Sequence, residues 1–211
     1  MARDRWATFD CYGTLIDWNG GIRAQLERVF GEESAGELLQ RYHELEPQLE
    51  ADGTLTYREV MTEAMRRLGA SDGEEDAVAQ SLPAWTPFPE VPAALMGARG
   101  RGWKLAILSN TDRDYIDASL AQLGVPFELA IVASEIGSYK PSLGHWHAFE
   151  EHVGRLPDVH VAASLFHDVA PANELGVPSI WINRLGERPG PQPTRELPDL
   201  NGLGETLDEL V

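Results

Sequence analysis

The amino-acid sequence predicts an α/β fold, in which helices cover both faces of a parallel sheet and a second, all-helical unit is inserted near the N-terminus. Short apolar runs alternate with segments of helical periodicity, which is typical of parallel strands joined by crossover helices. Residues 17–85 break this alternation, because they contain helical patterns only. A chain of 211 residues with 43% apolar side chains is long enough to bury a large core and carry a smaller insert.

The predicted strands are short apolar runs bounded by glycine, proline or polar residues, a pattern that indicates burial on both faces. They are residues 5–9, 103–108, 129–133, 159–163 and 178–182. Helical patterns lie between them, at residues 90–100, 112–123, 143–154 and 168–175. Strand and helix therefore alternate as in a doubly wound sheet.

The inserted unit shows helical patterns at residues 21–30, 34–50, 56–69 and 74–82. Prolines between residues 83 and 92 indicate a stiff return to the sheet. We therefore assign residues 1–16 and 86–211 to a core domain and residues 17–85 to a helical cap domain. The proline-rich residues 188–195 are expected to form an extended surface connection before a last short helix.

The composition argues against several classes of partner. Acidic residues number 34 against 17 basic ones, and the net charge of -17 repels nucleic acid and anionic lipid. No apolar run approaches the roughly 18 residues of a membrane span, so no membrane partner is expected. A single cysteine, Cys11, excludes an internal disulfide, and the first residues lack the apolar stretch of a secretory signal. We expect a cytoplasmic protein.

Polar residues follow the predicted strands at their carboxyl ends, where an open parallel sheet binds its ligands. They are Asp10 after the first strand, Ser109 and Asn110 after the second, Lys140 after the third, and Asp168 a few residues beyond the fourth. We expect these side chains to meet at one edge of the sheet.

These residue types suit nucleophilic chemistry on an anionic substrate. Asp10 precedes Gly13 and Thr14, so backbone N–H groups can face an anion while the threonine hydroxyl orients the carboxylate. A lysine at position 140 would keep Asp10 ionised, because two carboxylates and an anionic substrate would otherwise repel one another. The neutral side chains of Ser109 and Asn110 can hold a substrate carboxylate or phosphate without adding charge.

The order of these motifs resembles the haloacid dehalogenase (HAD) superfamily over essentially the whole chain. The motifs are Asp10-Cys-Tyr-Gly-Thr14, Leu108-Ser-Asn110, Tyr139-Lys-Pro141 and the late Asp168. The resemblance implies a Rossmann-like core with a helical cap inserted after the first strand. Residues 9–18 and 138–141 are most similar to the type II 2-haloacid dehalogenases.

That resemblance implies hydrolysis of short 2-haloalkanoic acids, small anionic carboxylates, without a cofactor. Asp10 would displace the halide to form an ester, and Asp168 would activate the water that hydrolyses it. Ser109, Asn110 and the N–H groups of Cys11 and Tyr12 would bind the substrate carboxylate. Arg41 of the cap would receive the halide, although its position beside Glu44, Glu46 and Glu50 also fits ion pairs on an exposed helix. A homodimer is a further implication.

Two positions distinguish the chain from the phosphatases of the superfamily. The phosphatase pattern has a second aspartate two residues after the nucleophile, where this chain has Tyr12. It also has an aspartate that holds Mg²⁺ where this chain has Ala163. Because a halide leaves without a proton and attack at carbon needs no metal to gather phosphoryl oxygens, both differences favour dehalogenation. Magnesium would be required only for the phosphatase alternative.

The late motif also departs from the dehalogenases, which typically have Ser-Ser-Asn-x-Trp-Asp. Here Ala163, Leu165 and His167 replace the first serine, the asparagine and the tryptophan. Residues 164–172 are more similar to a sister group that includes a hydrolase opening the ring of azetidine-2-carboxylate. There the leaving amine needs a proton, which His167 would supply or relay. The sequence therefore leaves open a reaction at the 2-carbon of another small carboxylate.

Overall fold

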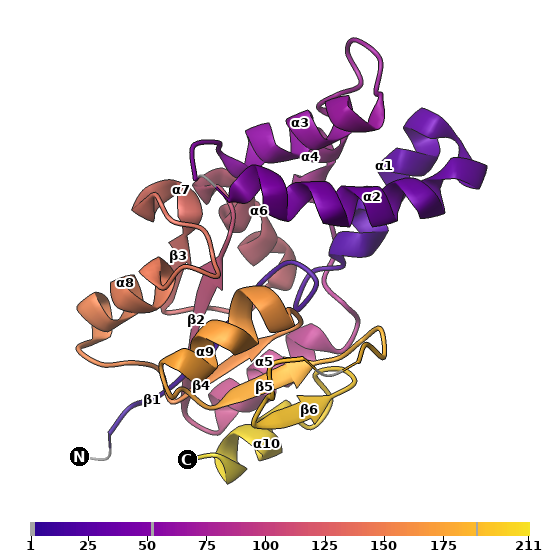
Figure 1. The fold of residues 1–211 in the computed structure, drawn as a ribbon. Helices are drawn as coiled ribbons and strands as arrows, with labels where there is room; N and C mark the ends of the chain where they lie inside the picture. The colour runs from indigo at the N-terminus through magenta and orange to yellow at the C-terminus, as the bar shows by residue number, and fades with distance from the viewer. Residues whose placement is uncertain (1–2, 52, 189) are drawn as a thin grey trace.

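The computed structural model describes residues 3–51, 53–188 and 190–211, and its core is a parallel sheet with a layer of helices above one end (Figure 1). The sheet has six strands in the order β3-β2-β1-β4-β5-β6, and every neighbouring pair is parallel. The strands are β1 (Arg5–Phe9), β2 (Trp103–Ser109), β3 (Leu129–Val132), β4 (Val159–Ala162), β5 (Ser179–Ile182) and β6 (Arg195–Leu197). The predicted parallel sheet is confirmed.

Successive residues of a strand point to opposite faces, and each face of this sheet has its own apolar core. Along β1, Ala7 and Phe9 join one cluster, whereas Trp6 joins the other together with Trp146 and Phe149. The helices that supply these layers and their connections are α5 (Val91–Gly100), α6 (Arg113–Leu123), α7 (Ala133–Ile136), α8 (Gly144–Val153), α9 (Ala170–Glu174) and α10 (Leu203–Glu209). Helices therefore cover both faces, as predicted.

Three short elements differ from the prediction. The edge strand β6 begins at Arg195, inside the stretch expected to be only a connection, and pairs with β5 from Ile180. The residue predicted to end the third strand, Ala133, instead begins α7. A π-helical turn, η2 (Leu165–Val169), precedes α9. Pro189 of the expected connection lies outside the described residues.

All the secondary-structure elements described between β1 and α5 are helical. They are α1 (Trp18–Phe30), α2 (Glu32–Glu50), α3 (Tyr57–Leu68), α4 (Ala77–Ser81) and a 3-10 turn, η1 (Leu82–Ala84). Helix α1 begins where the Asp17 side chain accepts the N–H of Gly20, and α3 begins with a capping box formed by Thr56 and Glu59. The helical character of the insert is confirmed, and its exact limits stay a prediction. None of the described helices is long and apolar enough to cross a membrane.

The chain leaves the sheet and returns to it through two segments that lie side by side. Ile16 and Pro87 form an antiparallel bridge, and the N–H of Phe88 donates to the carbonyl of Leu15 at 3.1 Å. A second connection reaches α3 from the core, where Asp112 accepts the N–H groups of the first two helical residues at 3.1 and 3.0 Å. These contacts hold the cap over the carboxyl ends of the strands.

Candidate active site

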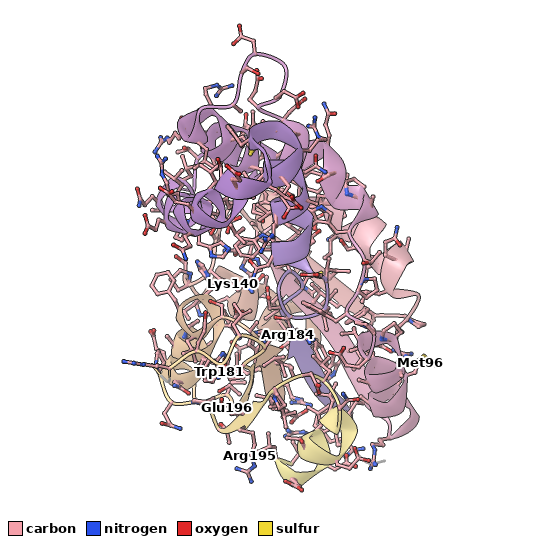
Figure 2. The ribbon with its side chains drawn as sticks, turned by 90° about the vertical axis from the view of Figure 1, so that its right-hand side faces the viewer. Met96, Lys140, Trp181, Arg184, Arg195 and Glu196 are labelled. Atoms are coloured by element: carbon pink, nitrogen blue, oxygen red, sulfur yellow. The ribbon has the colours of Figure 1, made fainter. Side chains whose placement is uncertain are left out.

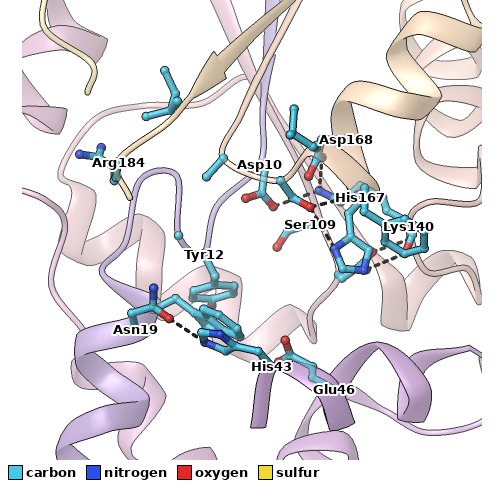
Figure 3. A pocket seen from close by; sticks show the side chains of 18 of the residues that line it. Asp10, Tyr12, Asn19, His43, Glu46, Ser109, Lys140, His167, Asp168 and Arg184 are labelled. Atoms are coloured by element: carbon cyan, nitrogen blue, oxygen red, sulfur yellow. Dashed lines mark hydrogen bonds and ion pairs between the residues drawn. The ribbon is translucent and has the colours of Figure 1, made fainter. Parts of the chain in front are cut away.

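A cavity of about 500 Å³ lies between the cap and the carboxyl ends of the central strands. Lys140 lies where the cap meets the core (Figure 2), and the cavity lining is seen from close by in Figure 3. The predicted site residues that line the cavity are Asp10, Tyr12, Ser109, Asn110, Lys140, His167 and Asp168. The structure thus brings most of the predicted set together.

Lys140 lies at the centre of this set. Its ammonium group donates to Asp10 Oδ1 at 2.9 Å, to Asp168 Oδ1 at 2.6 Å and to the carbonyl of Leu108 at 2.9 Å. An ammonium has three protons, so every donor is used. Burial lowers the pKa of Lys140, but the charges of the two carboxylates outweigh it and the pKa is raised. The lysine is therefore charged at any physiological pH.

The loop after β1 orients Asp10. Its Oδ2 accepts the hydroxyl of Thr14 at 2.7 Å, and that hydroxyl oxygen accepts the N–H of Ala163 at 2.9 Å. Gly13 has a φ of 86°, which only glycine adopts readily, and this lets the loop bring Thr14 back to the carboxylate. The side chain of Asp10 is 12% exposed, on the cavity. A carboxylate held in this way can attack a carbon atom placed above it.

Asp168 lies in the π-helical turn beyond β4, with its two oxygens in different surroundings. Oδ1 accepts from Lys140 and from Nε2 of His160, which is 2.9 Å away, while the other ring nitrogen of His160 faces the Thr8 hydroxyl at 2.9 Å. Oδ2 is buried and accepts no hydrogen bond from the described protein. Burial raises the pKa of Asp168, but the charge of Lys140 and the hydrogen bond from His160 lower it by more. The pKa is therefore lowered overall, and the carboxyl group is ionised.

His160 was not identified from the sequence. The feature of the sequence that could have identified His160 is the presence of a single histidine within the apolar strand of residues 159–162.

The side-chain amide of Asn110 holds the backbone of Lys140 in place and is therefore not free to bind a ligand in the cavity. Its Oδ1 accepts the N–H of Lys140 at 2.7 Å, and its Nδ2 donates to the carbonyl of Lys140 at 3.0 Å and to Glu50 Oε2 at 3.1 Å. Ser109 lies next to Asp10 in the same lining (Figure 3). Of the predicted carboxylate-binding pair, Ser109 thus has the more available side chain.

Cys11 and Tyr12 contribute differently. The thiol of Cys11 is fully buried outside the cavity lining, and burial raises its pKa. The ring of Tyr12 lines the cavity, and its hydroxyl lies 2.9 Å from that of Ser119. No backbone oxygen in the described ranges accepts the N–H of Cys11 or Tyr12 outside regular strands and helices. Both N–H groups remain candidates for binding an anion.

The structure does not bring Arg41 to the site. Arg41 is exposed on α2 and does not contribute to the cavity lining. The face of α2 that turns inward carries Tyr42, Glu46 and Glu50, which recur at the spacing of one helical turn. Arg41 precedes this series by one residue, or about 100° of rotation, and points to solvent. The predicted halide contact is therefore not supported.

Glu46 and Glu50 lie on the buried face of α2 and are not partners for Arg41 on an exposed helix face. They are 9% and 6% exposed, and both line the cavity from the cap side. Glu46 accepts the hydroxyl of Tyr57 at 2.8 Å. Burial raises the pKa of Glu46 to about 8, and burial together with the charge of Glu46 raises that of Glu50. Their spacing in the sequence places them on one helix face but does not show that this face turns inward.

Aromatic residues complete the cap side of the cavity. His43 stacks on Trp18 with ring centroids 4.8 Å apart and lies 2.9 Å from Asn19 Oδ1. All three line the cavity. Trp146, by contrast, does not line the cavity. It is fully buried beside His160, in the second apolar cluster of the sheet.

Basic side chains are scarce in this lining. Besides Lys140, the described lining contains Arg184, which donates to the carbonyl of Thr14 at 2.9 Å and pairs with Glu90 at 2.7 Å. Its guanidinium also lies 3.7 Å from the centre of the Phe88 ring. Arg184 was not identified from the sequence, and its charge is already matched.

His167, the residue before Asp168 in the late motif, lines the cavity. Its backbone N–H donates to the Ser164 hydroxyl at 3.0 Å, and its Nε2 lies 3.8 Å from Glu50 Oε2. Burial lowers the pKa of His167, so its ring is neutral near pH 7. It can accept a proton or pass one on.

The family model for haloacid dehalogenase-like hydrolases matches residues 5–163. The chain belongs to this family. Among curated members, it is 33% identical over 129 residues to the (S)-2-haloacid dehalogenase of Pseudomonas sp. (strain YL), a match covering 58% of this chain and 55% of that protein. It is 29% identical over 190 residues to haloacetate dehalogenase H-2 of Moraxella sp. (strain B), covering 84% of this chain and 85% of that one.

Solved structures of haloacid dehalogenases share the fold. The L-2-haloacid dehalogenase of Xanthobacter autotrophicus, with chloropropionic acid covalently bound, superposes with a TM-score of 0.85 at 20% identity and covers 99% of this chain and 100% of that one. The Rossmann-like core with its inserted helical cap is therefore the fold of this family member.

The residues that would hold Mg²⁺ in a phosphatase of this superfamily do not fit that role here. Ala163 supplies no ligand, and the Lys140 ammonium lies within 2.9 Å of both Asp10 and Asp168, the remaining carboxylates. The described ranges contain no group of three or more His, Cys, Asp or Glu side chains that could hold a metal ion. This set of side chains therefore does not fit a divalent cation.

Proposed function

We propose that this protein hydrolyses short 2-haloalkanoic acids to 2-hydroxyalkanoic acids through an ester on Asp10, without a metal or other cofactor. The observation that carries the proposal is the Asp10 carboxylate at the cavity floor, fixed by Thr14 on one oxygen and by the Lys140 ammonium on the other. The names of the matched relatives, two of them dehalogenases of 2-haloacids or haloacetate, support the same reaction class.

In the first step, an Asp10 oxygen forms a bond to the 2-carbon while the carbon–halogen bond breaks and the halide leaves with the electron pair. Ser109 and the N–H groups of Cys11 and Tyr12 would hold the substrate carboxylate. Lys140 keeps its charge throughout, so it offsets the second carboxylate nearby. No proton is needed by the leaving halide.

In the second step, water attacks the carbonyl carbon of the ester. Asp168 Oδ2, which accepts no hydrogen bond within the described protein, would orient this water and receive its proton. The bond between that carbon and the ester oxygen breaks, the leaving oxygen takes the proton back from Asp168, and the 2-hydroxy acid departs. Asp10 keeps one oxygen from water and releases the second water proton to solvent. His160 and Lys140 hold the other Asp168 oxygen and thereby fix its direction.

A second candidate substrate is a strained cyclic amino acid such as azetidine-2-carboxylate, in which the leaving group is a ring nitrogen. The position of His167 favours it, because the neutral ring lines the cavity 3.8 Å from Glu50 and can relay a proton. Consumption of azetidine-2-carboxylate without chloride release from 2-chloropropionate would select this reaction.

The proposal is tested by chloride release from 2-chloropropionate in metal-free buffer. We expect turnover by the wild type and a loss of at least about a thousandfold in Asp10→Asn, which lacks the nucleophile. The matched control is Asp117→Asn, at an exposed aspartate of α6. In Asp168→Asn, the ester on Asp10 should accumulate and add about 72 Da to the protein, the mass added by a 1-carboxyethyl ester. Near wild-type turnover by Asp10→Asn would overturn the proposal.

We further propose that the enzyme acts in the cytoplasm, where the single cysteine, Cys11, stays reduced. The homodimer stays a prediction that sedimentation can test.

A further inference from the structure

The cap side of the cavity carries two carboxyl groups that a haloalkanoate does not need. Glu46 and Glu50 face the floor from α2, and no lysine or arginine of the described chain forms an ion pair with either. On the floor the charges are matched, since Lys140 lies between Asp10 and Asp168. The two cap glutamates are therefore an unmatched pair of carboxyl groups above the reacting atoms.

Both carboxyl groups are held in place rather than free to swing into solvent. The Tyr57 hydroxyl donates to Glu46 and in turn accepts the Trp18 Nε1–H at 3.0 Å. Asn110 of the core donates to Glu50 at 3.1 Å. In Figure 3 the Glu46 carboxyl group is directed from the cap helix into the cavity. Each glutamate thus presents a fixed acceptor to whatever binds there.

A further polar group on the same face of α2 is the Tyr42 hydroxyl, which lies outside the cavity lining. Tyr42 is fully buried one helical turn before Glu46, and its hydroxyl has no hydrogen-bond partner within the described residues. Burial, and then the charges of Glu46 and Glu50, raise the pKa of Tyr42. The inward face of α2 therefore carries a buried hydroxyl without a partner in the described chain, in addition to two unmatched carboxyl groups.

Two buried carboxyl groups are costly to ionise without a cation, and a positively charged ligand beside them would offset that cost. A halide or an alkyl chain would instead bring a negative or an apolar group against them. The net charge of -17 also favours a substrate that is not simply an anion. The lining therefore fits a ligand with a carboxylate at the floor and a cation at the cap.

We propose that Glu46 and Glu50 form a receptor for a protonated amine of the substrate, so that the substrates are small carboxylates bearing a basic nitrogen. The inference rests on the proposed reaction at Asp10 and specifies which substrates reach it. The substrate carboxylate lies toward Ser109, and the ammonium lies against the α2 face.

A pair of substrates of equal length tests this inference. In 2-chloro-4-aminobutyrate an ammonium occupies the place of the terminal methyl of 2-chloropentanoate. The kcat/KM of the wild type should be about tenfold or more higher for the amino compound. This ratio corresponds to roughly 1.4 kcal/mol, the contribution expected of one ion pair. In Glu46→Gln/Glu50→Gln the preference should fall to about one. Glu44→Gln, at an exposed glutamate of the same helix, should keep the full preference.

Binding to Asp10→Asn separates this inference from the reaction. Calorimetry on that variant measures the affinity for each compound whether or not chloride is released. The amino compound should bind about tenfold more tightly, and less so when Glu46 and Glu50 are glutamine. Equal binding of the two compounds, or a preference unchanged by those substitutions, would overturn the receptor. If the wild type released no chloride from either compound while Asp10→Asn kept the binding preference, the proposed reaction would be overturned and the receptor would stand.

Discussion

At the scale of single residues, the position of Lys140 decides how two carboxylates coexist at the cavity floor. Its ammonium touches Asp10 and Asp168, and its side chain is 1% exposed. Replacing it by methionine would leave two like charges buried close together. We expect Lys140→Met to lower kcat by at least about a hundredfold and to cost about 3–5 kcal/mol of unfolding free energy.

Chloride release and urea unfolding measure these two effects. The control is Lys104→Met, because Lys104 is a partly exposed lysine paired with Asp4 at 2.5 Å, where a salt bridge is worth about 1 kcal/mol or less. Wild-type activity and stability in Lys140→Met would contradict the role given to the ammonium.

Glu46 makes stability depend on pH. Its pKa is about 8 in the fold against 4.5 as the ordinary value, because burial disfavours the charged form. The folded state therefore keeps a proton that the unfolded state releases, and stability falls as pH rises between these values. The slope is about 1.4 kcal/mol per pH unit, so we expect a loss of roughly 2–3 kcal/mol between pH 6 and pH 8.

Glu46→Gln should remove the part of this loss that Glu46 contributes and keep the part from Glu50, whose pKa burial also raises, whereas Glu44→Gln should retain both. Urea unfolding at a series of pH values measures the difference. The same pH dependence in Glu46→Gln and in the wild type would show that another group is responsible.

Residues at strand ends could be predicted from the sequence, and residues on cap helices could not. Asp10, Ser109 and Asp168 follow buried strands, and parallel strands bring their carboxyl ends together. On a helix, a shift of one residue rotates the side chain by about 100°, which separates the exposed Arg41 from the buried Tyr42. The sequence does not indicate which face of α2 turns inward, because charged residues occur on both.

At the scale of elements, one core aspartate connects α3 to the sheet domain. Asp112 accepts the N–H groups of Tyr57 and Arg58, which no residue inside the helix can satisfy. Asp112→Ala should cost about 1 kcal/mol of unfolding free energy, the usual value of a helix cap. It should also raise KM, because Tyr57 lines the cavity and would be held less firmly.

Steady-state kinetics and urea unfolding test this connection. Asp114→Ala removes an exposed aspartate that pairs with the Arg58 side chain at 2.6 Å, and it should leave KM unchanged. An equal effect of both substitutions would mean that Asp112 acts through its charge alone.

Long, periodic elements were predictable, and the shortest ones were not. The strands β1 and β2 and the helices α2 and α3 each contain enough residues to show their period. The strand β6 has three residues and forms only by pairing with β5, a contact across the sheet that local sequence does not encode. The π-helical turn η2 depends on the Ser164 hydroxyl accepting the His167 N–H, which a smooth helical pattern conceals.

At the scale of the whole molecule, the net charge of -17 opposes the entry of an anionic substrate. Salt screens this field, with a Debye length of about 10 Å at 0.1 M ionic strength. The KM for 2-chloropropionate should therefore fall a few-fold, on the order of two- to fivefold, as sodium sulfate raises the ionic strength from about 0.01 to 0.15 M.

The zwitterion 2-chloro-4-aminobutyrate has no net charge, so its KM should change little over the same range. Initial rates of chloride release measure both constants. A KM for 2-chloropropionate that rises with salt would indicate that local cations, rather than the overall field, govern its binding.

The central claim is that Asp10 is esterified and that water attacks its carbonyl carbon. Multiple turnovers in ¹⁸O-labelled water, followed by mass spectrometry of the peptide that contains Asp10, test it most directly. The account predicts that Asp10 gains ¹⁸O, because one carboxylate oxygen is replaced from water in each cycle. Label in the 2-hydroxy acid during the first turnover, with none in Asp10, would show that water attacks the substrate directly and would contradict the account.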